Sequence, residues 1–499
     1  MRQSLATATF LSSAALAAAY APPPGLETFQ PRSEFTAVCK QISSAVSSAS
    51  EVHFPVLDLN AAYVKDIGHW ASSSTQQAAC SVEPGTAEDV GTILQILGKT
   101  NTPFAVKGGG HASNPGFSST EGVHIAMYKF SDVTYNAGSN TADVGAGLVW
   151  DDVYAALEPY AVNVVGGRVT GVGVAGFTLG GGYSWKTNQY GLTVDNLSGY
   201  ELVLPNGTVT TVTESSYPDL FWGLKGGYNN FGIVTKFTLK TYPQTEVWGG
   251  LITITADQLE AVNNATVKFA QTVTDPKAAV LPTYNFLLGG PGVSLLLFYD
   301  YPTPPAGIFD DFLAIPHLSK DVSTRTFSDL VQAAPSDATA GTRGIFHTVS
   351  LLEYTPNIMA AVVNETKFWG QRLSLASGSF ISYDVEPFLP TLLSHAPEGS
   401  SAYPPSRARG LLPLNIYYAY GAEAADNDMY EAARQSAAHL TQVAVSEGQD
   451  VADAALYGNY AIFDTPLERV VGSNLDRLKG LKAQYDPGNV MGLAGGWKF

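Results

Sequence analysis

Hydrophobic positions follow two different patterns along the chain, and each pattern predicts a different kind of domain. In residues 76–245, short β-rich runs alternate with stretches of helical periodicity. The clearest helix begins after Thr86, a predicted N-cap with Asp89 three residues later, and its apolar positions share one face. Asn206 and Gly207 join two β-rich runs and predict a hairpin. This part of the chain should therefore alternate strands and helices.

Residues 246–454 carry longer β-rich runs. These runs include GVSLLLFYDY, GIFHTVSLLEY, GSFISYDVEPF and LLPLNIYYAYG, and helical stretches such as the one that starts near Asp426 separate them. The pattern predicts a mainly antiparallel sheet backed by helices. Residues 455–499 return to short elements with another glycine-rich turn. We therefore expect an α+β protein with two main domains.

The N-terminus has the features of a secretory signal peptide. A short basic start, an apolar run and small residues predict a signal peptide over residues 1–19. Residues 20–75 should then pack on the domain that follows. Cys39 and Cys80, the only cysteines, predict one disulfide in an oxidising compartment, the alternative being two unrelated buried thiols. Sequons that predict N-glycosylation begin at Asn206, Asn264 and Asn364.

Charge narrows the class of partner. The chain has a net charge of −17, with 27 basic and 44 acidic residues. Binding to nucleic acid or to an anionic membrane needs a basic surface, so this composition argues against both and favours a small-molecule partner. The histidines and cysteines show no spacing typical of metal ligands, and we predict no metal site. No motif indicates a particular oligomeric state.

Three glycine clusters carry the strongest chemical signal. They lie at Gly108–Gly110, within residues 166–184 and within residues 224–235. Glycine allows the backbone to approach a ligand closely, and consecutive turn amides can bind phosphate oxygens. Three such loops predict one large anionic ligand, whereas each loop alone is equally well explained as a structural turn. The P-loop and Rossmann fingerprints do not occur, so neither of those sites is expected.

Taken together, several segments resemble a known family of flavoproteins. VKGGGHASNPGFSSTEGVHI, VVGGRVTGVGVAGFTLGGGYS, YGLTVDNL, DLFWGLKGGYNNFGIVTKF and LDRLKGLKAQYDPGNVMGLAGG occur in family order. They resemble the berberine-bridge-enzyme-like branch of the vanillyl-alcohol-oxidase, or para-cresol-methylhydroxylase (PCMH), superfamily, and the secreted fungal members above all. The resemblance implies a PCMH-type FAD-binding domain over residues 76–245, a substrate domain over residues 246–454, and a segment, residues 455–499, that returns to the FAD domain.

The resemblance also assigns the cofactor site. It implies that His111 is bonded covalently to FAD and that Lys107 to Gly110 form the phosphate loop. From the residues alone, the favoured interpretation of His111 is an ordinary loop histidine. Bicovalent relatives carry a cysteine where this chain has Val169, so we predict a single covalent link. The other residues implied to surround FAD are Ala112, Thr170, Gly171, Gly173, Gly176, Leu179, Gly180, Gly181, Gly182, Tyr183, Asp195, Asn196, Gly232, Ile233, Val234 and Asn489.

The segment LYGNYAIFD matches the Tyr-x-Asn-Tyr strand of the family. Alternation along a strand would place Tyr457 and Asn459 on one face and Tyr460 on the other. We predict that these three are the catalytic residues and that Tyr457, as a tyrosinate, accepts a substrate proton. The alternative is that Tyr457 is a sheet residue with a satisfied hydroxyl. Tyr418 and Tyr420 are predicted to line the substrate pocket.

The expected activity is that of a secreted FAD-dependent oxidase. Hydride would leave an alcohol or amine carbon of a small molecule, most simply a secondary metabolite, for the flavin, and O₂ would reoxidise the flavin to give hydrogen peroxide. A mono- or oligosaccharide oxidase is the nearest alternative. A flavoprotein that catalyses a redox-neutral cyclisation and an extracellular binding protein without activity are the alternatives from other classes.

Overall fold

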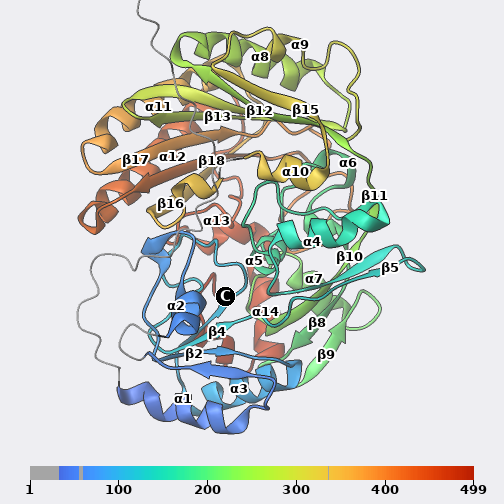
Figure 1. Ribbon diagram of the computed structural model, residues 1–499, viewed down its shortest axis with the longest axis vertical. Helices are drawn as coiled ribbons and strands as arrows, with labels where there is room; N and C mark the ends of the chain where they lie inside the picture. The colour runs from blue at the N-terminus through green and yellow to red at the C-terminus, as the bar shows by residue number, and fades with distance from the viewer. Residues whose placement is uncertain (1–32, 56–59, 335) are drawn as a thin grey trace, which may run out of the picture. The chain divides into compact units, whose positions relative to one another are not determined.

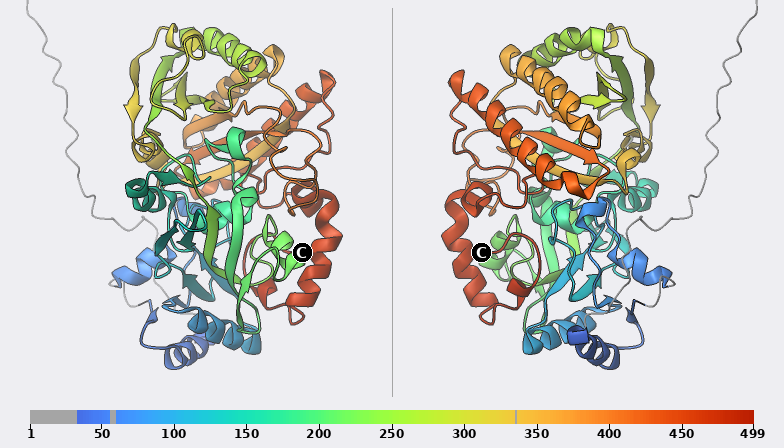
Figure 2. Two further views of the ribbon diagram at one scale, coloured as in Figure 1. Left: turned by 90° about the vertical axis from the view of Figure 1, so that its right-hand side faces the viewer. Right: turned by 90° about the vertical axis from the view of Figure 1, so that its left-hand side faces the viewer.

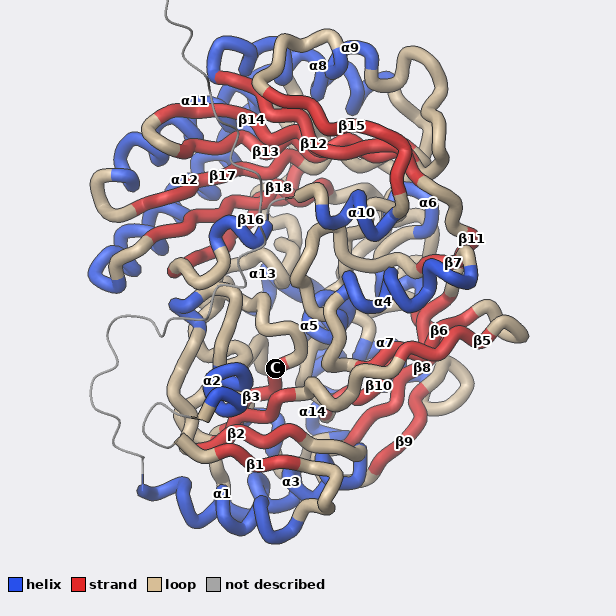
Figure 3. The backbone as a smooth tube through the Cα atoms, viewed as in Figure 1, coloured by secondary structure: helices blue, strands red, loops and turns tan. Residues whose placement is uncertain are grey.

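The computed structural model describes residues 33–55, 60–334 and 336–499 (Figure 1). The predicted signal peptide lies outside the described residues. The strands gather into separate sheets (Figure 3): sheets of four, five and two strands lie within residues 51–243, and a sheet of seven strands lies within residues 247–420. Among the described helices, none is long and apolar enough to cross a membrane.

The first sheet has four strands in the order β1-β2-β4-β3. The strands are β1 (Glu51–His53), β2 (Cys80–Glu83), β3 (Phe104–Lys107) and β4 (Val123–Ala126). Strands β2, β4 and β3 run parallel, because helix α3 (Ala87–Thr100) carries the chain back from β2 to β3. The hydroxyl of Thr86 accepts a hydrogen bond from the amide of Asp89, which confirms the predicted N-cap.

The second sheet has five antiparallel strands in the order β5-β6-β10-β8-β9. The strands are β5 (Val133–Asn136), β6 (Thr141–Gly145), β8 (Leu197–Val203), β9 (Val209–Val212) and β10 (Ile233–Lys240). Strands β8 and β9 flank Asn206 and Gly207, so the predicted hairpin is confirmed. Helices α4 (Trp150–Leu157), α5 (Val174–Leu179), α6 (Thr187–Tyr190) and α7 (Pro218–Leu224) complete this part, with a short pair of strands, β7 (Val162–Asn163) and β11 (Tyr242–Pro243).

The third sheet has seven antiparallel strands in the order β15-β12-β14-β13-β17-β18-β16, which confirms the predicted antiparallel sheet. The strands are β12 (Val247–Thr255), β13 (Ala278–Leu287), β14 (Gly290–Tyr299), β15 (Ser319–Arg325), β16 (Arg343–Leu351), β17 (Gly378–Val385) and β18 (Leu412–Tyr420). Helices α8 (Leu259–Thr272), α11 (Pro356–Ser374) and α12 (Asp426–Ser446) form a layer on one face, as Figure 2 shows. The shorter helices α9 (Asp310–Leu313) and α10 (Phe327–Gln332) lie in the connections.

Strand alternation decides which tyrosines of β18 face the helices. The hydroxyl of Tyr418 lies 2.7 Å from that of Tyr383, which in turn lies 2.7 Å from the hydroxyl of Ser436 on α12. Tyr420 donates a hydrogen bond to Asp426, the first residue of the same helix. Both side chains therefore point away from the cavity described below, and the prediction that they line the pocket is wrong. Tyr417 points to the cavity instead.

The C-terminal segment, red in Figure 1, returns to the first part of the fold. Helix α13 (Leu467–Val471) leads to α14 (Leu475–Tyr485), which contacts α7. Ala494 forms a β-bridge with Phe104, and the side-chain amide of Asn230 donates a hydrogen bond to the carbonyl of Trp497. The expectation of a strand at residues 456–464 is wrong: the segment forms turns, because its amides bond locally, as that of Tyr460 does to the carbonyl of Tyr457.

The predicted disulfide between Cys39 and Cys80 is present and joins α1 (Ser33–Ala45) to β2. The two cysteines are 41 residues apart, and closing a loop of that length stabilises a fold by about 4 kcal/mol in the chain-entropy model. The sequon asparagines Asn206, Asn264 and Asn364 are all exposed, whereas Asn196, which also begins a sequon, is buried.

Candidate active site

A cavity of about 890 Å³ lies between the glycine loops and the seven-stranded sheet. One wall consists of residues 108–114, the segment around Gly173, and Gly232–Val234 at the start of β10. The opposite wall consists of side chains from β12, β13, β14, β17 and β18. A space of this size, walled by two different parts of the fold, is the usual setting of a ligand site.

Two glycine loops meet backbone to backbone in the first wall. A Cβ atom at Gly109 would lie 2.5 Å from the Cα of Gly173, and a Cβ at Gly173 would lie 2.5 Å from the amide nitrogen of Gly109. Gly110 has φ +76°, a conformation that glycine adopts without steric cost. Only glycines permit this approach, and they leave peptide groups rather than side chains on the cavity surface. Such a surface suits the phosphate groups of a dinucleotide.

His111 follows this loop and lies in the cavity wall. Its ring stacks on Trp70, with ring centroids 4.4 Å apart and an interplanar angle of 15°. Burial lowers the pKa of His111 to about 4, so the imidazole is neutral at pH 7. Its Nε2 is buried and has no hydrogen-bond partner among the described residues. A neutral ring with an unsatisfied nitrogen at a cavity fits the predicted attachment point of FAD.

The side chain of Lys107 does not reach the cavity. Its ammonium donates to the carbonyls of Lys65, Asp66 and Gly68 at the end of α2 (Ala61–Ile67), at 3.0, 2.7 and 2.5 Å. The lysine is buried there, and burial lowers its pKa to about 7. Its ammonium group, when protonated, stabilises the carbonyl end of a helix, and of the predicted phosphate loop only the three glycines line the cavity.

Several other residues predicted to surround FAD do not line the cavity but contact the loops that form its wall. Asp195 is ion-paired with Arg407 at 2.5 Å, and Asn196 donates to the carbonyls of Tyr190 and Leu192. Thr170 donates to Asp151. These contacts hold the loops in place, so the residues act as supports and do not line the cavity. The other predicted FAD residues that do not line the cavity are Gly171, Gly180, Gly181, Gly182 and Asn489. The predicted FAD residues that do line the cavity are Ala112, Gly173, Gly176, Leu179, Tyr183, Gly232, Ile233 and Val234.

Tyr457, Asn459 and Tyr460 all line the cavity, which the turn at this segment makes possible. The oxygen of Tyr457 accepts hydrogen bonds from the amide of Gly182 at 3.2 Å and from the side-chain amide of Asn459 at 2.8 Å. Burial nevertheless raises the pKa of Tyr457 to about 12, although both hydrogen bonds oppose the rise. The phenol is therefore protonated at pH 7, and its O–H makes no hydrogen bond to any residue that the structure describes.

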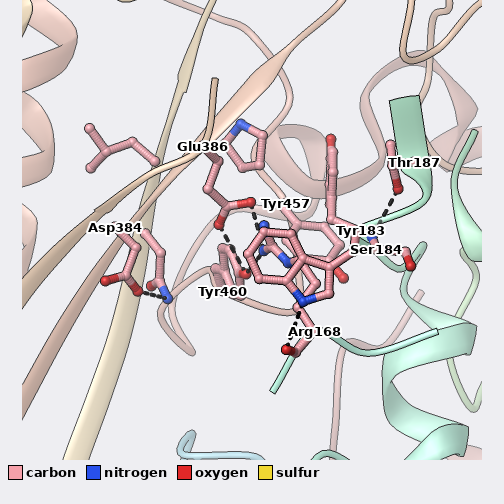
Figure 4. A network of polar contacts seen from close by, with 12 residues as sticks. Arg168, Tyr183, Ser184, Thr187, Asp384, Glu386, Tyr457 and Tyr460 are labelled. Atoms are coloured by element: carbon pink, nitrogen blue, oxygen red, sulfur yellow. Dashed lines mark hydrogen bonds and ion pairs between the residues drawn. The ribbon is translucent and has the colours of Figure 1, made fainter. Parts of the chain in front are cut away.

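A buried network of opposite charges lies beside Tyr457 (Figure 4). Arg168 approaches Glu386 to 2.6 Å, and it donates a hydrogen bond to the oxygen of Tyr460 at 2.8 Å. Tyr460 in turn donates to the other carboxylate oxygen of Glu386 at 3.1 Å. Burial raises the pKa of Glu386 to about 7, while the charge of Arg168 opposes the rise. A carboxyl group with that pKa can accept a proton near neutral pH.

Sequence reasoning missed Arg168, Glu386 and Trp70. Arg168 is a lone charge in an otherwise apolar, glycine-rich stretch, and that contrast was its one available signal. Glu386 follows β17 in a segment without a motif. Trp70 belongs to the N-terminal segment, and the amide of Trp70 donates to the carbonyl of Gly110, which places the segment against the first glycine loop.

Comparison with known proteins defines the class first. The family profile described as FAD binding domain matches residues 78–213. FAD-dependent monooxygenase drtC of Aspergillus calidoustus is 30% identical over 450 residues, which cover 86% of this chain and 84% of that protein. An uncharacterized FAD-linked oxidoreductase of Arthroderma benhamiae is 37% identical over 271 residues, about half the length of each chain. The protein is thus an FAD-linked oxidoreductase.

Solved structures refine this assignment through the fold. The berberine bridge enzyme of Eschscholzia californica superposes with a TM-score of 0.74 at 16% identity, covering 91% of this chain and 97% of that one. The 6-hydroxy-D-nicotine oxidase of Arthrobacter nicotinovorans gives 0.73 at 19% identity, covering 89% and 96%. The chain therefore belongs to the FAD-linked oxidoreductase family of its relatives, and it has the fold of berberine bridge enzyme, which its motifs resemble.

Proposed function

We propose that the protein is a FAD-dependent oxidase that removes hydride from an alcohol or amine carbon of a small molecule. One observation carries the proposal: a single cavity joins a neutral, unsatisfied His111 to a buried Glu386 whose pKa lies near 7. When bound, FAD supplies the two-electron acceptor, and O₂ as final oxidant is reduced to hydrogen peroxide.

The residues of the cavity have distinct roles in this proposal. Glu386 accepts the proton of the substrate hydroxyl or ammonium, and Arg168 favours the ionised form of Glu386 that does so. Tyr457 keeps its proton and directs its free O–H to the substrate, because its oxygen already accepts two hydrogen bonds. Tyr460 holds the carboxylate of Glu386 in place. Tyr457 thus positions the substrate, and the predicted role of proton acceptor passes to Glu386.

The proposal includes one covalent bond, from His111 to FAD. A neutral imidazole nitrogen is nucleophilic, and the unsatisfied Nε2 shows that the surrounding protein does not engage that side of the ring. A second link through cysteine is not available at Val169, because both cysteines form the disulfide. Gly108 to Gly110 would hold the phosphates through their peptide groups.

Acid denaturation tests the covalent bond. We expect yellow colour in the pellet of the wild-type protein and in the supernatant of the His111→Ala variant, because acid releases flavin that is held without a bond. Absorbance of pellet and supernatant near 450 nm gives the result. His347→Ala is the control, since this buried histidine lies outside the cavity wall. Colour in the wild-type supernatant would show that no bond forms.

The pH profile tests the proton acceptor. We expect kcat/KM to rise with pH through about 7 and then level off, because Glu386 must be ionised to accept a proton. Glu386→Gln should lower kcat/KM by roughly 10²- to 10⁴-fold. Tyr457→Phe should lower it less and leave the acidic limb in place, because the phenol does not ionise in this range. A larger loss in Tyr457→Phe, together with loss of that limb, would assign the proton transfer to Tyr457.

A monooxygenase is the second candidate, because several relatives carry that name, among them the protein of Aspergillus calidoustus. An oxidase releases one hydrogen peroxide per O₂ consumed and places no oxygen from O₂ in the product. We expect that stoichiometry, measured with an oxygen electrode and a peroxidase assay, and a product free of ¹⁸O after reaction under ¹⁸O₂. Labelled product would establish the monooxygenase. If substrate is converted but no O₂ is taken up and the flavin is not bleached under anaerobic conditions, the protein is a redox-neutral cyclase.

We also propose that the protein acts outside the cell. The disulfide and the exposed sequon residues Asn206, Asn264 and Asn364 support this location. Expression in a eukaryotic host should release the protein into the medium, and enzymatic removal of N-glycans should lower its mass. Retention of the full-length, unglycosylated chain inside the cells would argue against secretion.

A further inference from the structure

A row of polar side chains crosses the cavity face of the seven-stranded sheet. Thr253 pairs with Ser294, Ser294 with Thr283, Thr283 with Asp384 and Asp384 with Asn415, so the row runs through five adjacent strands. All five residues line the cavity. Neighbouring strands lie about 4.8 Å apart, and the row therefore presents polar groups at regular intervals along one wall.

Two members of this row have unsatisfied acceptors. The side-chain amide of Asn415 donates to Oδ2 of Asp384 at 3.1 Å. A carboxylate only accepts hydrogen bonds, so the amide nitrogen of Asn415 must face Asp384. Oδ1 of Asn415 therefore points away from the carboxylate of Asp384. Oδ1 of Asp384 and Oδ1 of Asn415 are both buried, and neither has a hydrogen bond of standard geometry within the described part of the chain. The hydroxyls of Thr283 and Ser382 lie close enough to Asp384 to lower its pKa.

Leaving buried acceptors unpaired costs stability, so such groups usually have a partner in the working protein. Burial raises the pKa of Asp384 to about 6, with the neighbouring Thr283 and Arg168 opposing the rise, and the group is therefore mainly ionised at pH 7. The surrounding wall includes Leu251, Leu281 and Leu296, which offer an apolar surface to the rest of a ligand.

We propose that Asp384 and Asn415 form an acceptor pair that selects substrates carrying two hydrogen-bond donors on one edge of an otherwise apolar frame. A dihydroxylated ring is the simplest such molecule. This inference rests on the proposed function, since it concerns the substrate of that same cavity. A site that accepts two donors rejects an analogue lacking them, because the acceptors are then buried without partners.

Calorimetric titration of the holoenzyme tests the acceptor pair without depending on turnover. The probes are resorcinol, 3-methoxyphenol and 1,3-dimethoxybenzene, together with the corresponding series from catechol. Within each series, one hydroxyl donor at a time is replaced by a methoxy group while the ring is kept. We expect the dihydroxy compound of at least one series to bind 10-fold or more tighter than its dimethyl ether. Equal affinities within both series would overturn the proposal, because they would show that water and not the substrate bonds the two acceptors.

Variants separate this pair from a general effect on the fold. Asp384→Asn should reduce the preference for the dihydroxy compound to less than 3-fold, whereas Asp321→Asn, an exposed carboxyl on β15, should preserve it. Asn415→Leu is the second variant, and it serves if Asp384→Asn does not fold. A preference unchanged in the folded variants would refute the pair. A donor preference without hydrogen peroxide production would support the pair and contradict the oxidase.

Discussion

The contact between Gly109 and Gly173 is the constraint on which the site depends. It brings the loop after β3 and the loop before α5 together at backbone distance, and any side chain at either position would separate them. Gly108 to Gly110 then line one wall of the cavity, and His111, the next residue, lies in the same wall beside Trp70. One steric requirement therefore sets both the peptide surface proposed for the phosphates and the position of the predicted link to FAD.

Burial sets the protonation states at this site. It lowers the pKa of His111, raises that of Glu386 and raises that of Tyr457, each toward the neutral form. The chemical consequences differ because the starting pKa values differ: the imidazole of His111 is neutral at pH 7, Glu386 titrates near pH 7, and Tyr457 keeps its proton. The charge of Arg168 opposes the rise in the pKa of Glu386 and so keeps part of the carboxyl ionised. This explains why a buried arginine occurs in a glycine-rich loop.

The seven-stranded sheet serves two environments through strand alternation. On β17 and β18, Tyr383 and Tyr418 face the helices, where their hydroxyls bond to each other and to α12. The alternate positions, Asp384 and Tyr417, face the cavity. A shift of one residue in register would exchange the two sets, so the pairing register decides which aromatic and polar groups meet the ligand.

The sequence by itself determined the class of flavoprotein, the antiparallel sheet of the second half, the α3 cap, the β8–β9 hairpin and the candidate role of His111, because these depend on local patterns and contiguous motifs. It did not reveal that Lys107 serves a helix end, that Asp195 pairs with Arg407, or that the Tyr457 segment turns. Nor did it reveal Glu386, Arg168 or the acceptors of Asp384 and Asn415. These are contacts between residues far apart in the chain, and only the tertiary structure fixes which of them meet and how deeply each is buried.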